Sequence, residues 1–246
     1  MKHKILSGVL LIGLQFAQAN VDINQLMQSY QNGDYQTALP LAQNYLKESI
    51  QQEGTTSLES AMAHNILGII LQNLQQNDQA QMEYQQAINI SNALSPSEQD
   101  ADTLETSYKN LASLYAQEGK IDQALEFYQK ALTLQELKSS ENYQDRWRTM
   151  LLIAQLYMDK KAFKSAATYI EKAGENLSSG LDQAFVLEYY LKLGQAMNND
   201  QLTINAAKSL ITFAKRLNPS PAVQESIQYY QSIIDTIQQQ HQTKKP

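Results

Sequence analysis

Five alanines recur along this chain at nearly equal steps. They are Ala38, Ala80, Ala124, Ala166 and Ala207, and the steps between them are 42, 44, 42 and 41 residues. Self-similarity at a fixed period of this length indicates a repeat architecture, in which each unit buries its apolar face only by packing against its neighbours. We therefore expect a stack of similar units rather than a chain folded around a single central core.

The clearest unit has the pattern Tyr-x-x-Leu-Ala-x-x-Tyr-x-x-x-Gly over residues 108–119. It continues as Ile-x-x-Ala-x-x-x-Tyr-x-x-Ala-Leu over residues 121–132. Apolar residues three and four positions apart predict two helices, and Gly119 can end the first of them at a positive φ angle. Small residues such as Ala112 and Ala131 allow the two helices to approach closely as an antiparallel pair.

This pattern closely resembles the tetratricopeptide repeat. The same template recurs upstream around Leu67-Gly68 and downstream around Ile153-Ala154. A plain tetratricopeptide repeat has ~34 residues, so the longer steps resemble the extended variant of kinesin light chain-like arrays. The resemblance covers roughly residues 20–240. It implies an all-α fold, an α-solenoid of about five helix-turn-helix repeats.

The chain ends in a segment that suits a capping helix. Asn218-Pro219-Ser220-Pro221 interrupts the last repeat, and an amphipathic stretch with Val223, Ile227 and Tyr230 on one stripe follows. Such a helix covers the last repeat with its apolar face and exposes its polar face. The expected segments are a signal peptide at 1–19, repeats at about 20–54, 55–96, 97–138, 139–177 and 178–217, a capping helix at 218–240 and a disordered tail at 241–246.

The first residues have the form of a secretory signal peptide. Lys2 and Lys4 precede an apolar run over residues 5–14, and the small-x-small pattern of Ala17 and Ala19 precedes Asn20. This run is too short to span a bilayer comfortably. We therefore predict cleavage after Ala19 and export, most simply to a bacterial periplasm. No cysteine follows the cleavage site, so a lipid anchor is not expected.

Composition excludes several classes of function. Without Lys2 and Lys4 the chain has 17 basic and 25 acidic residues, a net charge of −8, which does not suit a nucleic-acid binder. No cysteine occurs, so thiol catalysis, thiolate metal sites and disulfides are excluded. No apolar stretch of membrane-spanning length follows residue 19. We expect a soluble mature protein without membrane insertion.

The sequence offers no recognisable catalytic, cofactor or metal site. His64 and His241 are the histidines that remain after signal removal, and neither belongs to a metal-ligand motif. There is no nucleophile-elbow motif and no phosphate-binding glycine loop. The chain is therefore not expected to be an enzyme. Trp147, the single tryptophan, is either packed against the preceding repeat or an exposed binding aromatic.

The family resemblance also implies a binding face. In such arrays the first helix of each repeat lines the concave surface, and the positions that match mix amides with flexible apolar side chains suited to an extended peptide. The alternative is that the apolar members are buried against neighbouring helices. The predicted contact residues are Met62, Asn65, Ile69 and Gln72 in the second repeat, Lys109, Ser113 and Gln117 in the third, and Arg148, Leu151, Gln155 and Met158 in the fourth.

These features together predict a scaffold or adaptor of the cell envelope that binds a protein or peptide partner. A carboxylate clamp of the kind that grips chaperone tails is not expected, because Ser113 and Leu152 replace residues that such a clamp needs. Two alternatives remain open. The array is a self-associating structural protein, a homo-oligomer whose concave face is incidental, or it is the regulatory subunit of an envelope enzyme.

Overall fold

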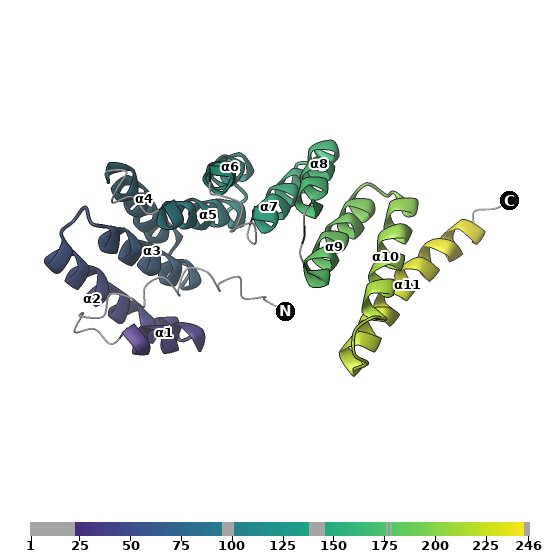
Figure 1. Cartoon of the computed structure of the whole chain (residues 1–246), viewed down its shortest axis with the longest axis horizontal. Coiled ribbons are helices and arrows are strands. Elements are labelled where there is room, and N and C mark those ends of the chain that lie inside the picture. Colours follow the sequence, from purple (N-terminus) through teal and green to yellow (C-terminus); the bar gives the residue numbers. More distant parts are fainter. Residues whose placement is uncertain (1–22, 95–100, 138–145, 176, 178, 244–246) are drawn as a thin grey trace. The chain divides into compact units, whose positions relative to one another are not determined.

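The computed structural model describes residues 23–94, 101–137, 146–175, 177 and 179–243, and these contain eleven helices and no strand (Figure 1). The all-α fold expected from the sequence is confirmed. The predicted signal peptide at 1–19 lies outside the described residues. The helices are α1 (Ile23–Gln31), α2 (Tyr35–Glu53), α3 (Leu58–Asn73), α4 (Asn77–Ala93), α5 (Ala101–Gln117), α6 (Ile121–Leu137), α7 (Arg146–Asp159), α8 (Phe163–Gly174), α9 (Gly180–Ala196), α10 (Asp200–Ala214) and α11 (Pro221–Thr243).

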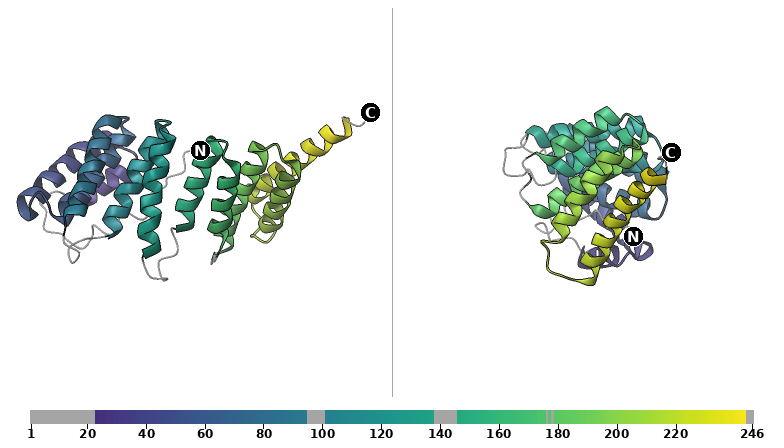
Figure 2. Two further views of the ribbon diagram at one scale, coloured as in Figure 1. Left: turned by 90° about the horizontal axis from the view of Figure 1, so that it is seen from above. Right: turned by 90° about the vertical axis from the view of Figure 1, so that its right-hand side faces the viewer.

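The chain divides into two compact units. Unit 1 covers residues 1–138 and holds helices α1 to α6, and unit 2 covers residues 139–246 and holds helices α7 to α11. Within each unit, consecutive helices pack side by side as pairs (Figure 2). Unit 1 thus has three helix-turn-helix repeats, and unit 2 has two such repeats followed by the single helix α11. The five repeats and terminal helix expected from the sequence are confirmed.

A left-handed residue ends the first helix of each pair. After α5, Gly119 has φ 72°, the N–H of Gly119 donates to the carbonyl of Ala116, and the N–H of Lys120 donates to the carbonyl of Tyr115. These bonds satisfy carbonyls that the helix end would otherwise leave without a partner. The same reversal recurs in the other turns, where the left-handed residues are Gly33, Gln75, Lys161 and Asn198. Only two of these five positions carry glycine, so glycine alone does not mark the turns.

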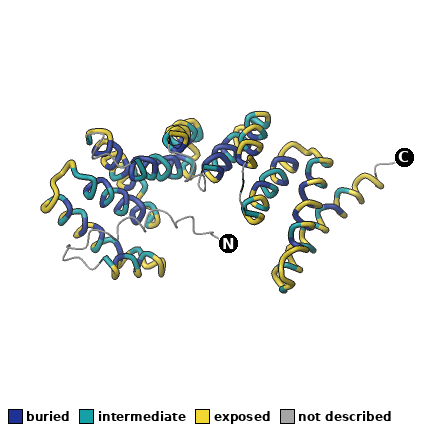
Figure 3. The backbone as a smooth tube through the Cα atoms, viewed as in Figure 1, coloured by how far each residue is buried: buried dark blue, intermediate teal, exposed yellow. Residues whose placement is uncertain are grey.

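Small residues bring the two helices of each pair together. In the third repeat Ala112, Ala124 and Ala131 are fully buried, as is Leu111, and Tyr128 is almost so. Because alanine has no side chain beyond Cβ, the helix backbones approach closely, and the larger residues fill the space between them. Figure 3 shows that buried residues recur along both helices of each pair. The small-residue pattern read from the sequence therefore forms the core of each repeat.

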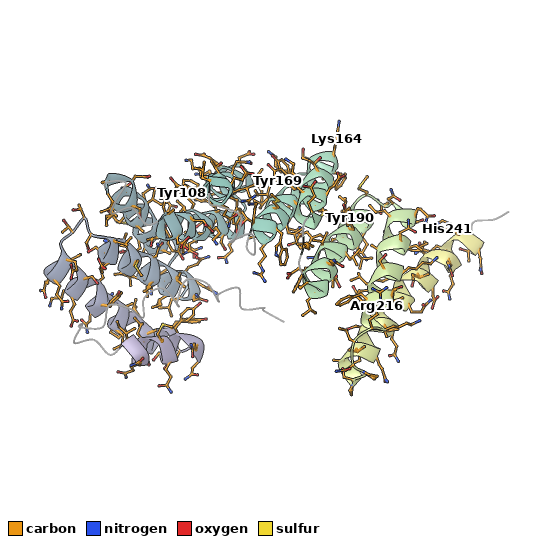
Figure 4. All side chains as sticks on the ribbon, viewed as in Figure 1. Tyr108, Lys164, Tyr169, Tyr190, Arg216 and His241 are labelled. Carbon is orange, nitrogen blue, oxygen red and sulfur yellow. The ribbon has the colours of Figure 1, made fainter. Side chains whose placement is uncertain are left out.

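Helix α11 covers the end of unit 2. Ile227, Tyr230 and Ile234 pack against a cluster that includes Leu191 of α9 and Leu210 of α10. The helix continues to Thr243, so the first three residues of the tail expected at 241–246 are helical instead, and 244–246 lie outside the described residues. His241 lies at this end of α11 (Figure 4). Its Nε2 lies 2.5 Å from Oδ2 of Asp200 on α10. This contact with α10 gives a physical reason for the added turn.

Candidate functional site

In unit 1 the first helices α1, α3 and α5 lie on one side, and their partners α2, α4 and α6 lie on the other (Figure 1). Helices α3 and α5 are joined directly by side-chain amides. Nδ2 of Asn65 donates to Oγ of Ser107 over 2.7 Å, and Nε2 of Gln72 donates to Oε1 of Gln117 over 2.9 Å. The bonded residues are 42 and 45 positions apart, close to the 44-residue step between Ala80 and Ala124, so similar levels of the first helices of the second and third repeats face each other.

Four of the predicted contact residues are buried. Asn65 is only 2% exposed, Ile69 on the same helix is 5% exposed, and Leu151 and Met158 on α7 are also buried. The side-chain NH2 of Asn65 donates to Oγ of Ser107 and to the carbonyl of Thr103, which are both on α5. These four side chains therefore pack inside the protein and are not available to a partner. The alternative interpretation expected this of the apolar Ile69, Leu151 and Met158, but not of Asn65.

The other seven predicted residues reach the surface. Gln117 and Arg148 are exposed, and the side chains of Met62, Gln72, Lys109, Ser113 and Gln155 are half-buried. Two of them, Gln72 and Gln117, are hydrogen-bonded to each other. In unit 2, Nε2 of Gln155 donates to Oδ1 of Asp159 one turn further along α7. The accessible part of the candidate face in unit 1 is thus formed by α3 and α5.

Gln72 also connects to the second helix of its own repeat. The hydroxyl of Tyr84, on α4, donates to Oε1 of Gln72 over 2.7 Å. The Tyr84 ring fits here because Gly68 has no side chain, and a Cβ at this position would lie 2.6 Å from the ring carbon Cε1. The repeat pattern of the sequence did not predict this bond from Tyr84 to the candidate face. The available signal was the pairing of a helix-interior glycine with a large polar aromatic in the same repeat.

Lys109 is held by a buried carboxylate. Its Nζ lies 2.8 Å from Oε1 of Glu105, one turn earlier on α5, and the same oxygen accepts a bond from Nε2 of Gln135 on α6. Glu105 is only 7% exposed. A buried carboxylate needs such donors, because an uncompensated charge in the interior is costly. Lys109 therefore serves first as a structural counter-ion, and its charge is not freely available to a ligand.

Trp147 belongs to the interior of unit 2. Its side chain is 7% exposed, and its ring lies 5.8 Å from the ring of Phe185 on α9. The guanidinium of Arg148 lies 4.7 Å from the centre of the Trp147 ring, a favourable cation–π geometry. The side chain is therefore not an exposed binding aromatic, and its ring contact is not with the preceding repeat as predicted. The aromatic neighbour is Phe185, in the following repeat.

His64 is part of the contact between α3 and α4. Its Nδ1 lies 2.6 Å from Oε2 of Glu83, and both side chains are mostly buried. Within the described ranges, no group of three or more His, Cys, Asp or Glu side chains could hold a metal ion. No helix in the same part of the chain is long and apolar enough to cross a membrane.

Comparison with known proteins agrees with this arrangement. Tetratricopeptide repeat family models match residues 62–94 and 102–179. The helix pairs found outside these ranges have the same form, so the chain is built of tetratricopeptide-like repeats. Proteins with this fold are typically non-catalytic scaffolds that bind protein or peptide partners. No curated protein matches the chain.

Solved structures share the fold at low sequence identity. A putative kinesin light chain with nearly identical TPR-like repeats from Podosopora anserina is 16% identical, with a TM-score of 0.69 over 78% of this chain and 92% of that one. BtubC (BKLC) from P. vanneervenii is 17% identical, with a TM-score of 0.64 over 83% and 90% of the two chains. The apo form of RapI is 14% identical, with a TM-score of 0.61 over 90% and 82%.

Proposed function

We propose that this protein is a non-catalytic scaffold of the bacterial cell envelope that binds a protein or an extended peptide on the face formed by α3 and α5. The observation that carries the proposal is the row of side-chain amides that links these helices and ends in the exposed Gln117. Half-buried Met62, Lys109 and Ser113 share these helices. The signal-peptide pattern over residues 1–19 supports the envelope location.

Side-chain amides suit a partner whose main chain is accessible. Each amide has a carbonyl acceptor and an NH2 donor, so it can pair with the N–H and C=O groups of an extended peptide. Flexible methionines such as Met62 adapt to apolar side chains of different shapes. These side chains together can bond to the main chain of a peptide and still accept different peptide sequences, as a scaffold for envelope proteins must.

The charges of unit 1 narrow the class of partner. The described residues of unit 1 include 4 lysines and 12 aspartates or glutamates. Lys109, Lys120 and Lys130 each lie within 2.8 Å of a glutamate oxygen. A polyanion would therefore meet net repulsion over this unit, which argues against nucleic acid and in favour of a protein partner.

One solved structure of this fold contains a bound factor. The structure of a Rap protein complexed with competence and sporulation factor is 13% identical to this chain, with a TM-score of 0.56. The match covers 87% of this chain and 62% of the Rap chain. At this identity the match supports the fold alone. The choice of face rests on the contacts of Gln72 and Gln117.

Replacing Ser113 with arginine is expected to reduce partner capture without unfolding the protein. Ser113 is half-buried on α5 between Lys109 and Gln117, and a long cationic side chain there would cover the face. Tagged protein recovered from the envelope fraction should carry a reproducible partner, and we expect Ser113→Arg to lose at least about 90% of it, roughly a tenfold change. The mass of the recovered chain should correspond to a start at Asn20.

The matched control is Thr133→Arg, since Thr133 is exposed on α6, away from the first helices. Both variants should unfold at the same temperature as the wild type, because surface substitutions usually change stability by less than ~0.5 kcal/mol. Equal loss of the partner in both variants, or no loss in either, would place binding elsewhere.

A further inference from the structure

Three side chains on three helices of unit 1 form a hydrogen-bonded chain. The hydroxyl of Tyr84 on α4 bonds to Oε1 of Gln72 on α3, and Nε2 of Gln72 bonds to Oε1 of Gln117 on α5. Tyr84 is completely buried, Gln72 is half-buried and Gln117 is exposed. This series of hydrogen bonds thus runs from the interior of the second repeat to the surface of the third.

The buried Tyr84 hydroxyl determines which group donates and which accepts in this series of hydrogen bonds. If the Gln72 amide were turned over, its NH2 group would face the Tyr84 oxygen, and the hydroxyl proton of Tyr84 would lose its acceptor. A buried donor without a partner costs about 1–3 kcal/mol. Burial also raises the pKa of the Tyr84 hydroxyl, so the group remains a proton donor at any physiological pH. Gln72 therefore keeps its carbonyl towards Tyr84 and its NH2 towards Gln117.

The orientation of the Gln72 amide also sets the orientation of the exposed Gln117 amide. Because Oε1 of Gln117 accepts the bond from Gln72, the NH2 group of Gln117 is the part of this amide left for a ligand. We propose that Tyr84, acting through Gln72, orients the exposed amide of Gln117 so that it donates to a main-chain carbonyl of the bound peptide. This inference rests on the proposed function, and it makes Tyr84 and Gln72 positioning residues.

The relay can be tested without any ligand. Tyr84→Phe removes the hydroxyl and keeps the ring against Gly68, so the side-chain NH2 resonances of both Gln72 and Gln117 should shift in nitrogen-resolved NMR spectra. Gln117 is bonded to Gln72 and not to Tyr84, so only a relay carries the change to it. The control is Tyr45→Phe on α2, which should leave both resonances in place. An unchanged Gln117 signal in Tyr84→Phe would overturn the relay.

The role of the Gln117 NH2 group as a donor to the peptide is tested by a binding measurement. The ligand is a peptide selected on the wild-type protein from a random library. In Gln72→Glu a carboxylate accepts from both Tyr84 and Gln117, which turns the Gln117 amide over and presents its carbonyl. In Gln117→Glu the bond from Gln72 is kept, but the outward group is an acceptor. Each variant should bind the selected peptide at least about tenfold more weakly, the equivalent of ~1.4 kcal/mol.

Gln85→Glu supplies the matched control, because Gln85 is exposed on α4, where its Nε2 donates to Oδ1 of Asn89 one turn away. It adds the same charge to unit 1 and should change the affinity by less than about twofold. Wild-type affinity in Gln72→Glu would contradict the donor role. If no peptide can be selected on the wild type, the proposed function fails and the donor role fails with it, whereas the NMR comparison still decides whether the relay exists.

Discussion

Replacing Gly194 with alanine is expected to destabilise unit 2 by about 2–3 kcal/mol, the upper part of the range for overpacked cores. A Cβ at Gly194 on α9 would lie 2.8 Å from the backbone nitrogen of Thr203 on α10 and 2.6 Å from its Oγ1. A backbone atom cannot move aside as a flexible side chain can, so the two helices must separate. This loss exceeds the ~1 kcal/mol that alanine gains over glycine in helix propensity.

The measurement is urea unfolding followed by tryptophan fluorescence. Trp147 is the only tryptophan of the chain and lies in unit 2, so its signal reports on this unit. Gly174→Ala is the matched control, since a Cβ there would lie 3.5 Å from Cγ1 of Val186, an ordinary contact. This control should be as stable as the wild type or slightly more so. Equal unfolding midpoints for Gly194→Ala and Gly174→Ala would contradict the close approach of α9 and α10.

Replacing Tyr84 with alanine is expected to cost unit 1 about 3–5 kcal/mol, as for other buried aromatic residues truncated to alanine. Tyr84 is completely buried, its ring fills the space that Gly68 leaves open, and its hydroxyl bonds to Gln72. Truncation therefore removes a large apolar side chain, leaves a cavity and takes away the only donor to Oε1 of Gln72 that the described residues provide.

Far-ultraviolet circular dichroism during urea unfolding measures this effect, because unit 1 holds six of the eleven helices described. Met82→Ala lies on the same helix at a position that is 66% exposed, and should change stability by less than ~0.5 kcal/mol. Tyr84→Phe keeps the ring and should lose only about 1 kcal/mol. If Tyr84→Ala were as stable as Met82→Ala, the packing of Tyr84 against Gly68 would be wrong.

The architecture could be predicted from the sequence because its causes lie within one repeat. Ala112, Ala124 and Ala131 recur at helical spacing, and this local pattern is enough to pair two helices. The turns were harder to predict from the sequence. Gln75 and Lys161 adopt left-handed conformations that their side chains do not favour, so only the surrounding helix contacts impose them.

The candidate face was predicted less well, because burial there depends on contacts between repeats. Asn65 and Ile69 occupy positions that the resemblance assigned to the open surface, yet both are buried. The bond from Asn65 to Ser107 depends on how closely α3 and α5 approach, and no pattern within a single repeat encodes that distance. The same holds for the relay through Gln72, whose three members come from three helices.

The central claim is that a partner lies across α3 and α5, and site-specific photo-crosslinking in cells tests it most directly. A photoreactive residue would be placed at Gln117 on α5, or at Gln129 on α6, which is also exposed but belongs to a second helix. We expect a discrete crosslinked partner from position 117 and none from position 129. Crosslinks of equal yield from both positions, or from position 129 alone, would contradict the account.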